Sequence, residues 1–196
     1  MEGRVHHFGA IGIANGLAVL ADRESRTQWD HITGEAFAGP LAGQHLDAWP
    51  VRMTTVAAAR REHPELTVHT SAYRGLLRRF AERLYPRFIY GGVWLPPPFY
   101  LSMSRSIDKR LPPLTQGLGV VDGNRACYYP MALIPTGGLE DSWNRRILCI
   151  WRGPVDGVPR AAWKDTGAEP MQLLSRWYGF AFTFPACDVY RGAPGS

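Results

Sequence analysis

Two pairs of short apolar runs, each joined by an asparagine and a glycine, constrain the fold of this 196-residue chain most strongly. Asn and Gly tolerate the positive φ angles that two-residue hairpin turns require. The turns are Asn15-Gly16 and Gly123-Asn124. The sequence therefore predicts two β-hairpins, which comprise Val5–Ile13 with Gly16–Ala21 and Gly117–Asp122 with Arg125–Tyr129.

Further segments are typical of strands or helices. The expected strands are Leu46–Val51 at a sheet edge because of Pro50, Leu66–Thr70, Arg146–Trp151 and Val158–Trp163. One helix is expected to begin at Thr54 or Thr55 and to end at His63, because Pro64 disfavours helical geometry before it. Met131–Ile134 fits a short helix or a strand, and Ser71–Leu84 has the apolar spacing of an amphipathic helix.

An aromatic and proline-rich stretch, Tyr85–Ser106, separates the two halves of the chain. The consecutive prolines Pro96 to Pro98 favour polyproline geometry, which would hold the neighbouring aromatic side chains on a stiff loop. Such a loop would either cover a pocket as a lid or pack on its own aromatics.

The composition is that of a globular protein, with 45% hydrophobic and 12% aromatic residues. No linker divides the chain, so we expect residues 1–196 to form a single domain. The expected fold class is β-rich α+β: antiparallel hairpins in a barrel- or sandwich-like arrangement with two or three helices.

Charge and cysteine content exclude several function classes. The net charge of +5 is carried almost entirely by Arg, but no basic run or nucleic-acid-binding motif is present, so no nucleic-acid partner is expected. Three cysteines without C-x-x-C spacing argue against a disulfide framework and a structural zinc site. No signal-peptide pattern or membrane-length apolar run occurs, so we expect a cytoplasmic location and no membrane partner.

The candidate catalytic residues follow the second run of the first hairpin. Asp22 or Glu24, held by Arg23 or Arg26, would act as a general base or orienting group; the alternative is an ion pair that stabilises a turn. His31 is a further candidate because histidine titrates near neutral pH, although it would point away from its neighbour Asp30 on extended chain.

Histidines and cysteines give weaker indications. A metal site would need His6 or His7 to converge with others, such as His31, His45, His63 or His69, and no spacing enforces this, so no metal or other cofactor is expected. Cys127 and Cys149 lie in strand-like runs typical of a core, whereas Cys187 would be a nucleophile if a base approached it.

Aromatic side chains are unusually frequent and would either line a cavity or fill the core. An apolar, aromatic-lined cavity with a few placed charges is the usual form of a small-molecule site. The candidate substrate-binding residues are Trp29, Trp94, Phe99, Tyr100, Tyr129 and Trp177.

One long motif, together with later segments, resembles a known family. The motif contains Asp22-Arg23-Glu24, Trp29, Thr33-Gly34, Ala36, Gly39-Pro40-Leu41-Ala42-Gly43 and Leu46. The later segments are His63-Pro64, Arg110-Leu111-Pro112-Pro113, Gly119 to Ala126, Tyr129-Pro130 and Trp177 to Phe182 with Pro185 and Tyr190. They resemble the bacterial and archaeal domain-of-unknown-function family 3179 (DUF3179), of which this chain would be a shortened member. The chain lacks the pair of cysteines that this family carries upstream. Any redox or metal role of that pair is therefore not implied for this chain.

These observations favour a cofactor-free enzyme that transforms an apolar or aromatic small molecule in a biosynthetic pathway, as a cyclase, isomerase or hydrolase. A non-catalytic ligand-binding or assembly module is the alternative, and a histidine-dependent metalloenzyme is the third. The sequence leaves the oligomeric state open.

Overall fold

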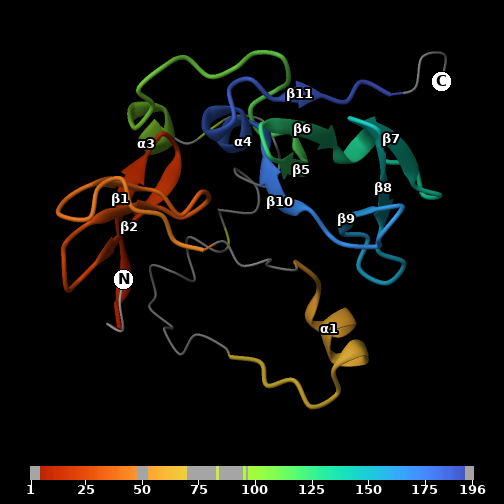
Figure 1. The fold of residues 1–196 in the computed structure, drawn as a ribbon, viewed down its shortest axis with the longest axis horizontal. Coiled ribbons are helices and arrows are strands. Elements are labelled where there is room, and N and C mark those ends of the chain that lie inside the picture. Colours follow the sequence, from red (N-terminus) through yellow and green to blue (C-terminus); the bar gives the residue numbers. More distant parts are fainter. Residues whose placement is uncertain (1–4, 48–52, 70–82, 84–94, 96, 193–196) are drawn as a thin grey trace. The chain divides into compact units, whose positions relative to one another are not determined.

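The computed structural model describes residues 5–47, 53–69, 83, 95 and 97–192. By its internal contacts the chain divides into two compact units: unit 1 comprises Met1–Pro50 and Leu95–Ile107, and unit 2 comprises Val51–Trp94 and Asp108–Ser196. Each unit has its own β-sheets (Figure 1). The expectation that both belong to one domain stays a prediction.

Unit 1 contains an antiparallel sheet whose strands follow chain order, β1-β2-β3-β4. The strands are β1 Phe8–Ala14, β2 Leu17–Asp22, β3 Gln28–Asp30 and β4 Ala36–Ala38. Asn15 and Gly16 join β1 to β2 with φ angles of 54° and 73°, which confirms the first predicted hairpin. A β-bulge between Ala10 and Gly12 shifts the register of this pair by one residue.

Unit 2 has two sheets, with strand orders β10-β5-β6-β11 and β7-β8-β9. The strands are β5 Gln116–Asp122, β6 Arg125–Pro130, β7 Leu139–Trp143, β8 Arg146–Arg152, β9 Pro159–Trp163, β10 Met171–Arg176 and β11 Asp188–Val189. The β5–β6 pair is the second predicted hairpin, and Arg146–Trp151 and Val158–Trp163 were correctly expected as strands. Only β11 pairs in parallel among these described strands.

Side chains of alternate residues sort onto the two faces of the β10-β5-β6-β11 sheet. One face packs against β7-β8-β9 through a core that includes Leu118, Cys127 and Trp143. The other face packs against helix α4, Trp177–Thr183, through Tyr128 and Phe180. The described residues thus form a β-rich α+β fold with sandwich-like packing, and none of their sheets closes into a barrel.

Two short helical segments were expected from the sequence. Helix α1, Val56–Glu62, has Thr55 as its N-cap, whose side chain accepts a hydrogen bond from the Ala58 N–H, and His63 as its C-cap. A 3₁₀ helix, η2, covers Met131–Leu133. The predicted helix Ser71–Leu84 lies outside the described residues apart from residue 83.

Three local predictions were wrong where the chain is described. Residues 66–69 form no strand, and no described strand pairs with them. The side chains of Leu66 and Val68 are instead 42% and 43% exposed. Leu46 and Asp47, the described part of the predicted strand Leu46–Val51, likewise lie outside any strand, next to a single bridge between Glu35 and His45, and residues 48–51 lie outside the described residues.

The third wrong prediction concerns the prolines. Pro97 and Pro98 begin helix α3, Pro97–Leu101, rather than forming polyproline geometry, and Pro96 lies outside the described residues. Proline is tolerated there because the N–H groups of a first helical turn have no intrahelical acceptor.

Within the described ranges, no helix combines the length and apolar character needed to cross a membrane.

Candidate functional site

Asp22 ends strand β2 and anchors the tight turn that follows it. The Asp22 N–H donates to the carbonyl of Thr27 at 3.2 Å, and the Arg26 N–H donates to the carbonyl of Asp22 at 3.0 Å. Arg26 has a φ of 58°, a left-handed conformation that allows the chain to reverse. The turn fixes the position of the Asp22 side chain beneath it.

The Asp22 carboxylate is buried, at 1% exposure, and accepts several hydrogen bonds. The N–H of Ser25 donates to Oδ1 at 2.6 Å, and the Ser25 hydroxyl donates to Oδ2 at 2.6 Å. The indole of Trp29 donates to Oδ2 at 3.0 Å. Burial alone raises the pKa of Asp22, but the bonds from Ser25 and Trp29 outweigh it and hold this pKa far below its ordinary value.

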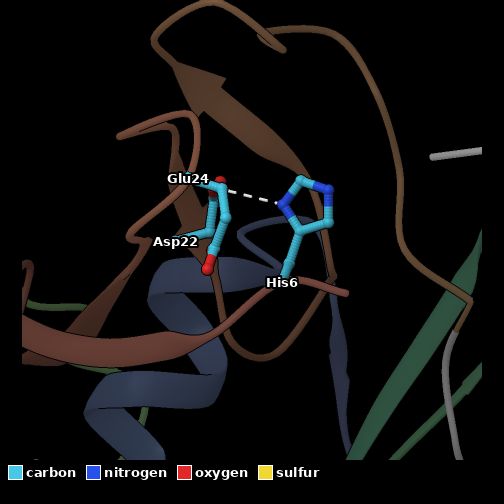
Figure 2. Close-up of side chains that lie close together, drawn as sticks. All are labelled: His6, Asp22 and Glu24. Atoms are coloured by element: carbon cyan, nitrogen blue, oxygen red, sulfur yellow. Dashed lines mark hydrogen bonds and ion pairs between the residues drawn. The ribbon is translucent and has the colours of Figure 1, made fainter. Parts of the chain in front are cut away.

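His6 approaches the same carboxylate from the segment before β1. Its Nδ1 lies 3.3 Å from Oδ1 of Asp22, and its side chain is only 9% exposed. Figure 2 shows the other ring nitrogen pointing away from both carboxylates of the cluster. Because an ionised carboxylate only accepts hydrogen bonds, Asp22 favours the tautomer with the proton on Nδ1 and a lone pair on Nε2.

Glu24 lies beside Asp22 and pairs with the next histidine. The His7 N–H donates to Oε2 of Glu24 at 2.9 Å, and His7 Nδ1 lies 2.7 Å from Oε1. The bond from the His7 N–H, together with the contact of its ring, lowers the pKa of Glu24 to about 2. Both carboxylates are therefore ionised at neutral pH.

Potential ligand atoms of His6, Asp22 and Glu24 all lie within 4.8 Å of one another (Figure 2). Two ionised carboxylates at this spacing attract positive charge, which either a protonated histidine or a metal cation supplies. Imidazole nitrogen and carboxylate oxygen are ordinary ligands of divalent transition metals. The cluster can therefore act chemically as a proton-transfer pair or as a metal site.

The other candidates on the motif do not join this cluster. Arg23 is exposed, and no ion pair joins it or Arg26 to Asp22 in the described chain. Its N–H instead donates to the His7 carbonyl at 3.0 Å. His31 is also exposed and contacts the Ala18 carbonyl through Nδ1 at 2.8 Å. The turn-stabilising interpretation of Asp22 thus fits its contacts with Ser25, without the arginine ion pair that we expected.

The candidate substrate-binding aromatic residues lie in different parts of the structure. Trp29 is buried, at 1% exposure, against Asp22. Phe99 is half-buried in α3 and Tyr100, in the same helix, is 46% exposed, whereas Trp94 lies outside the described residues. The proposed role of residues 94–100 as a lid stays a prediction.

Tyr129 and Trp177 are core residues on opposite faces of the β10-β5-β6-β11 sheet, each at 0% exposure. The Tyr129 hydroxyl donates to Oδ2 of Asp141 at 2.5 Å, and the Trp177 indole donates to the Asp108 carbonyl at 3.1 Å. The structure therefore does not bring these two side chains together in one cavity.

The cysteines are all free, and two are buried. Burial raises the pKa of Cys127 to about 12 and also raises the pKa of Cys187. The guanidinium of Arg110 lies near the Cys187 sulfur, at 3.7 Å, but does not reverse the effect of burial. A neutral thiol is a weak nucleophile, so neither buried cysteine has the properties of a catalytic one.

Sequence reasoning missed the pairing of His6 with Asp22 and of His7 with Glu24. Part of the signal was present in the hairpin: counting back from Asn15-Gly16 without a bulge places His7 opposite Glu24 and His6 opposite Ser25, just after β2. The bulge between Ala10 and Gly12 then decides which histidine lies next to which carboxylate.

A comparison with protein-family models matches the family described as "Protein of unknown function (DUF3179)" over residues 1–169. No curated protein and no solved structure matches the chain.

Proposed function

The chain belongs to the DUF3179 family, and we propose that it is a small-molecule-transforming enzyme in which His6, held by Asp22, transfers protons. The reaction would be a non-redox one of the cyclase, isomerase or hydrolase type, within a biosynthetic pathway. The observation that carries the proposal is the 3.3 Å contact between His6 Nδ1 and a buried aspartate that stays ionised.

In this proposal Asp22 is a positioning residue and His6 is the catalytic base. Hydrogen bonds from Ser25 and Trp29 hold Asp22 in place, and Asp22 in turn orients the imidazole ring. The lone pair on Nε2 takes a proton from the substrate, and the Asp22 carboxylate stabilises the imidazolium that forms. The same nitrogen then returns the proton to the product.

An apolar or aromatic substrate fits the residues beside the cluster. Phe8 follows His7 directly and is 40% exposed. Its ring meets the Trp29 ring edge-on, with centroids 6.0 Å apart, and Trp29 is the residue that holds Asp22. An exposed aromatic ring next to the proton-transfer pair supports a substrate with an apolar group.

A cytoplasmic location is part of the proposal and is supported by the cysteines. All three are free, and free thiols persist in a reducing compartment.

The test compares variants in a mixture of cellular metabolites, so the substrate need not be identified in advance. Wild-type protein and His6→Gln are incubated with a cell extract, and compounds that disappear are identified by mass spectrometry. His45→Gln is the matched control, because His45 is an exposed histidine of the same unit. We expect wild type and the control to consume the same compound, and His6→Gln to do so more slowly by a factor of about 100 or more.

Two results would contradict the proposal. Equal consumption by His6→Gln and wild type would remove the role of His6. A compound that binds the wild-type protein but is never converted would favour the non-catalytic ligand-binding or assembly module.

A second candidate, a histidine-dependent metalloenzyme, is favoured by the 4.8 Å grouping of His6, Asp22 and Glu24. A divalent cation would replace the His6–Asp22 contact, and the hydrogen bonds from Ser25 and Trp29 would then orient a ligating Asp22 from outside the metal's coordination shell.

Glu24→Gln separates the two candidates, because Glu24 belongs to the metal cluster but not to the His6–Asp22 pair. Chelator-treated protein is titrated with Zn²⁺ and Mn²⁺ by calorimetry, with Glu35→Gln, an exposed glutamate of unit 1, as the control. A metalloenzyme requires stoichiometric binding that Glu24→Gln loses together with activity. Proton transfer by His6 requires activity in chelator-treated protein and in Glu24→Gln.

A further inference from the structure

A polar cleft of about 470 Å³ lies entirely within unit 2, beside strands β6, β7 and β11. A volume of this order is within the range of small-molecule sites. Its charged lining residues are Arg125, Glu140, Asp141, Asp188 and Arg191. None of these belongs to the His6 cluster.

Most of these charges already have partners. Arg125 lies 3.5 Å from the carboxylate of Asp188, and its guanidinium lies over the Trp143 ring at 4.4 Å. Glu140 pairs with Lys164 at 2.7 Å. Among the residues that the structure describes, Asp141 and Arg191 are left without an oppositely charged partner.

Asp141 is half-buried and is held by neutral donors on one oxygen only. The Tyr129 hydroxyl donates to its Oδ2 at 2.5 Å, and the Trp143 indole N–H is shared between the Tyr129 hydroxyl, at 2.8 Å, and the same Oδ2, at 3.1 Å. Within the described ranges Oδ1 has no hydrogen bond. Two buried side chains therefore fix the carboxylate of this cleft-lining residue through Oδ2 alone.

Tyr190 supplies an aromatic surface in the same cleft. It lies in the segment after β11 and packs on Tyr129, with ring centroids 5.4 Å apart. Arg191 follows it and is exposed. The cleft thus combines an anion, an aromatic ring and a cation, and within the described part of the chain neither the anion nor the cation forms an ion pair.

We propose that this cleft binds an aromatic zwitterion of amino-acid size, with its ammonium group on Asp141, its carboxylate on Arg191 and its ring against Tyr190. An ammonium group donates the charge-assisted hydrogen bonds that Oδ1 lacks, and a guanidinium matches a carboxylate in a bidentate fork. This site does not depend on the function proposed for His6.

Three matched probes test the proposal with the wild-type chain. L-phenylalanine carries both charged groups, phenethylamine only the ammonium, and 3-phenylpropanoate only the carboxylate. Each is titrated into ¹⁵N-labelled protein, and the amide shifts of Asp141, Val189 and Tyr190 are followed. We expect saturable shifts with L-phenylalanine, and weaker binding of each singly charged probe by about tenfold or more.

Two variants then assign the charges. Asp141→Asn should abolish the advantage of L-phenylalanine over 3-phenylpropanoate, because only the ammonium contact is lost. Arg191→Gln should abolish its advantage over phenethylamine. Asp165→Asn, an aspartate of unit 2 outside the cleft lining, should leave all three affinities within about twofold of wild type.

Three outcomes would overturn the proposal. They are the absence of saturable shifts at these amides up to the solubility of L-phenylalanine, equal affinity for the three probes, and unchanged probe preference in both variants. Arg191→Gln alters an exposed side chain, so it decides the carboxylate assignment even where Asp141→Asn fails to fold.

Discussion

The indole Nε1 of Trp29 donates a hydrogen bond of 3.0 Å to Oδ2 of Asp22, and both residues are 1% exposed. A buried carboxylate needs donors for its oxygens, and a buried indole N–H needs an acceptor. Each residue therefore supplies what the other requires, across the turn between β2 and β3. The motif that contains them is in the first place a structural element of unit 1.

Trp29→Phe should destabilise unit 1, because it removes a donor from a buried carboxylate. The expected loss in free energy of unfolding is about 1.5–3 kcal/mol, the usual contribution of a hydrogen bond to a charged group. Chemical denaturation of wild type, Trp29→Phe, Asp22→Asn and the double variant measures this loss and the coupling between the two residues. Additive effects of the two single changes would show that the bond does not stabilise the fold.

The stability of unit 1 should fall at acidic pH because of Asp22. Its folded pKa is lowered, so the stabilisation is fully present above the pKa of an unfolded aspartate, about 3.9, and is lost as the pH falls towards the folded value. Glu24 contributes with the same sign, since its pKa is lowered to about 2.

Thermal unfolding between about pH 5 and pH 2 measures this dependence. Asp22→Asn should flatten the curve in this range. Asp47 is an exposed aspartate of unit 1, so Asp47→Asn should unfold with the same dependence on pH as the wild type. An unchanged slope in Asp22→Asn would show that other carboxyl groups govern acid unfolding.

Local sequence patterns correctly predicted the elements that depend only on neighbouring residues. The hairpins depend on turns of two residues and on adjacent runs, so sequence alone was sufficient for β1–β2 and β5–β6. Leu66–Thr70 has strand composition but no pairing partner where it is described, and propensity does not supply one. The sequence also did not decide between a barrel and a sandwich, because that choice depends on contacts between residues far apart in the sequence.

The candidate site was predicted in part. Asp22 and Glu24 were identified because charged side chains follow the second run of the first hairpin, and the structure brings both together with His6. Trp29 was expected to bind substrate and instead donates a hydrogen bond to Asp22. The register of His6 against Asp22 depends on a one-residue bulge in β1, which no local pattern announces. Tyr129 was proposed to contact substrate directly but is fully buried, and it contacts the cleft residues Asp141 and Tyr190 from within the core.

Asp156→Ala should be among the more destabilising single changes in unit 2. Its side chain is 1% exposed and accepts hydrogen bonds from Arg160 at 2.6 Å and from Thr54 at 2.6 Å. Removing it leaves a largely buried guanidinium without its counter-ion, which costs about 3–5 kcal/mol. Asp165→Ala breaks the exposed pair with Arg146 and should cost below about 1 kcal/mol. Similar losses for both variants in urea denaturation would contradict the role assigned to burial.

Gly119→Ala should destabilise the packing of α4 on the β10-β5-β6-β11 sheet. A Cβ at Gly119 would overlap the Phe180 ring, whose atoms Cε2, Cδ2 and Cζ are its nearest neighbours. Overpacking of a core in this way costs about 1–3 kcal/mol. Gly137→Ala is the control, because a Cβ there meets nothing within 4 Å.

The double variant Gly119→Ala/Phe180→Leu separates steric overlap from a general intolerance of alanine at this strand position. Leucine removes the ring that the new methyl group overlaps, so Gly119→Ala should cost less in the Phe180→Leu background than in the wild type. Urea denaturation of the four proteins gives the coupling energy. An equal cost of Gly119→Ala in both backgrounds would mean that the close approach of Phe180 is not what requires glycine in β5.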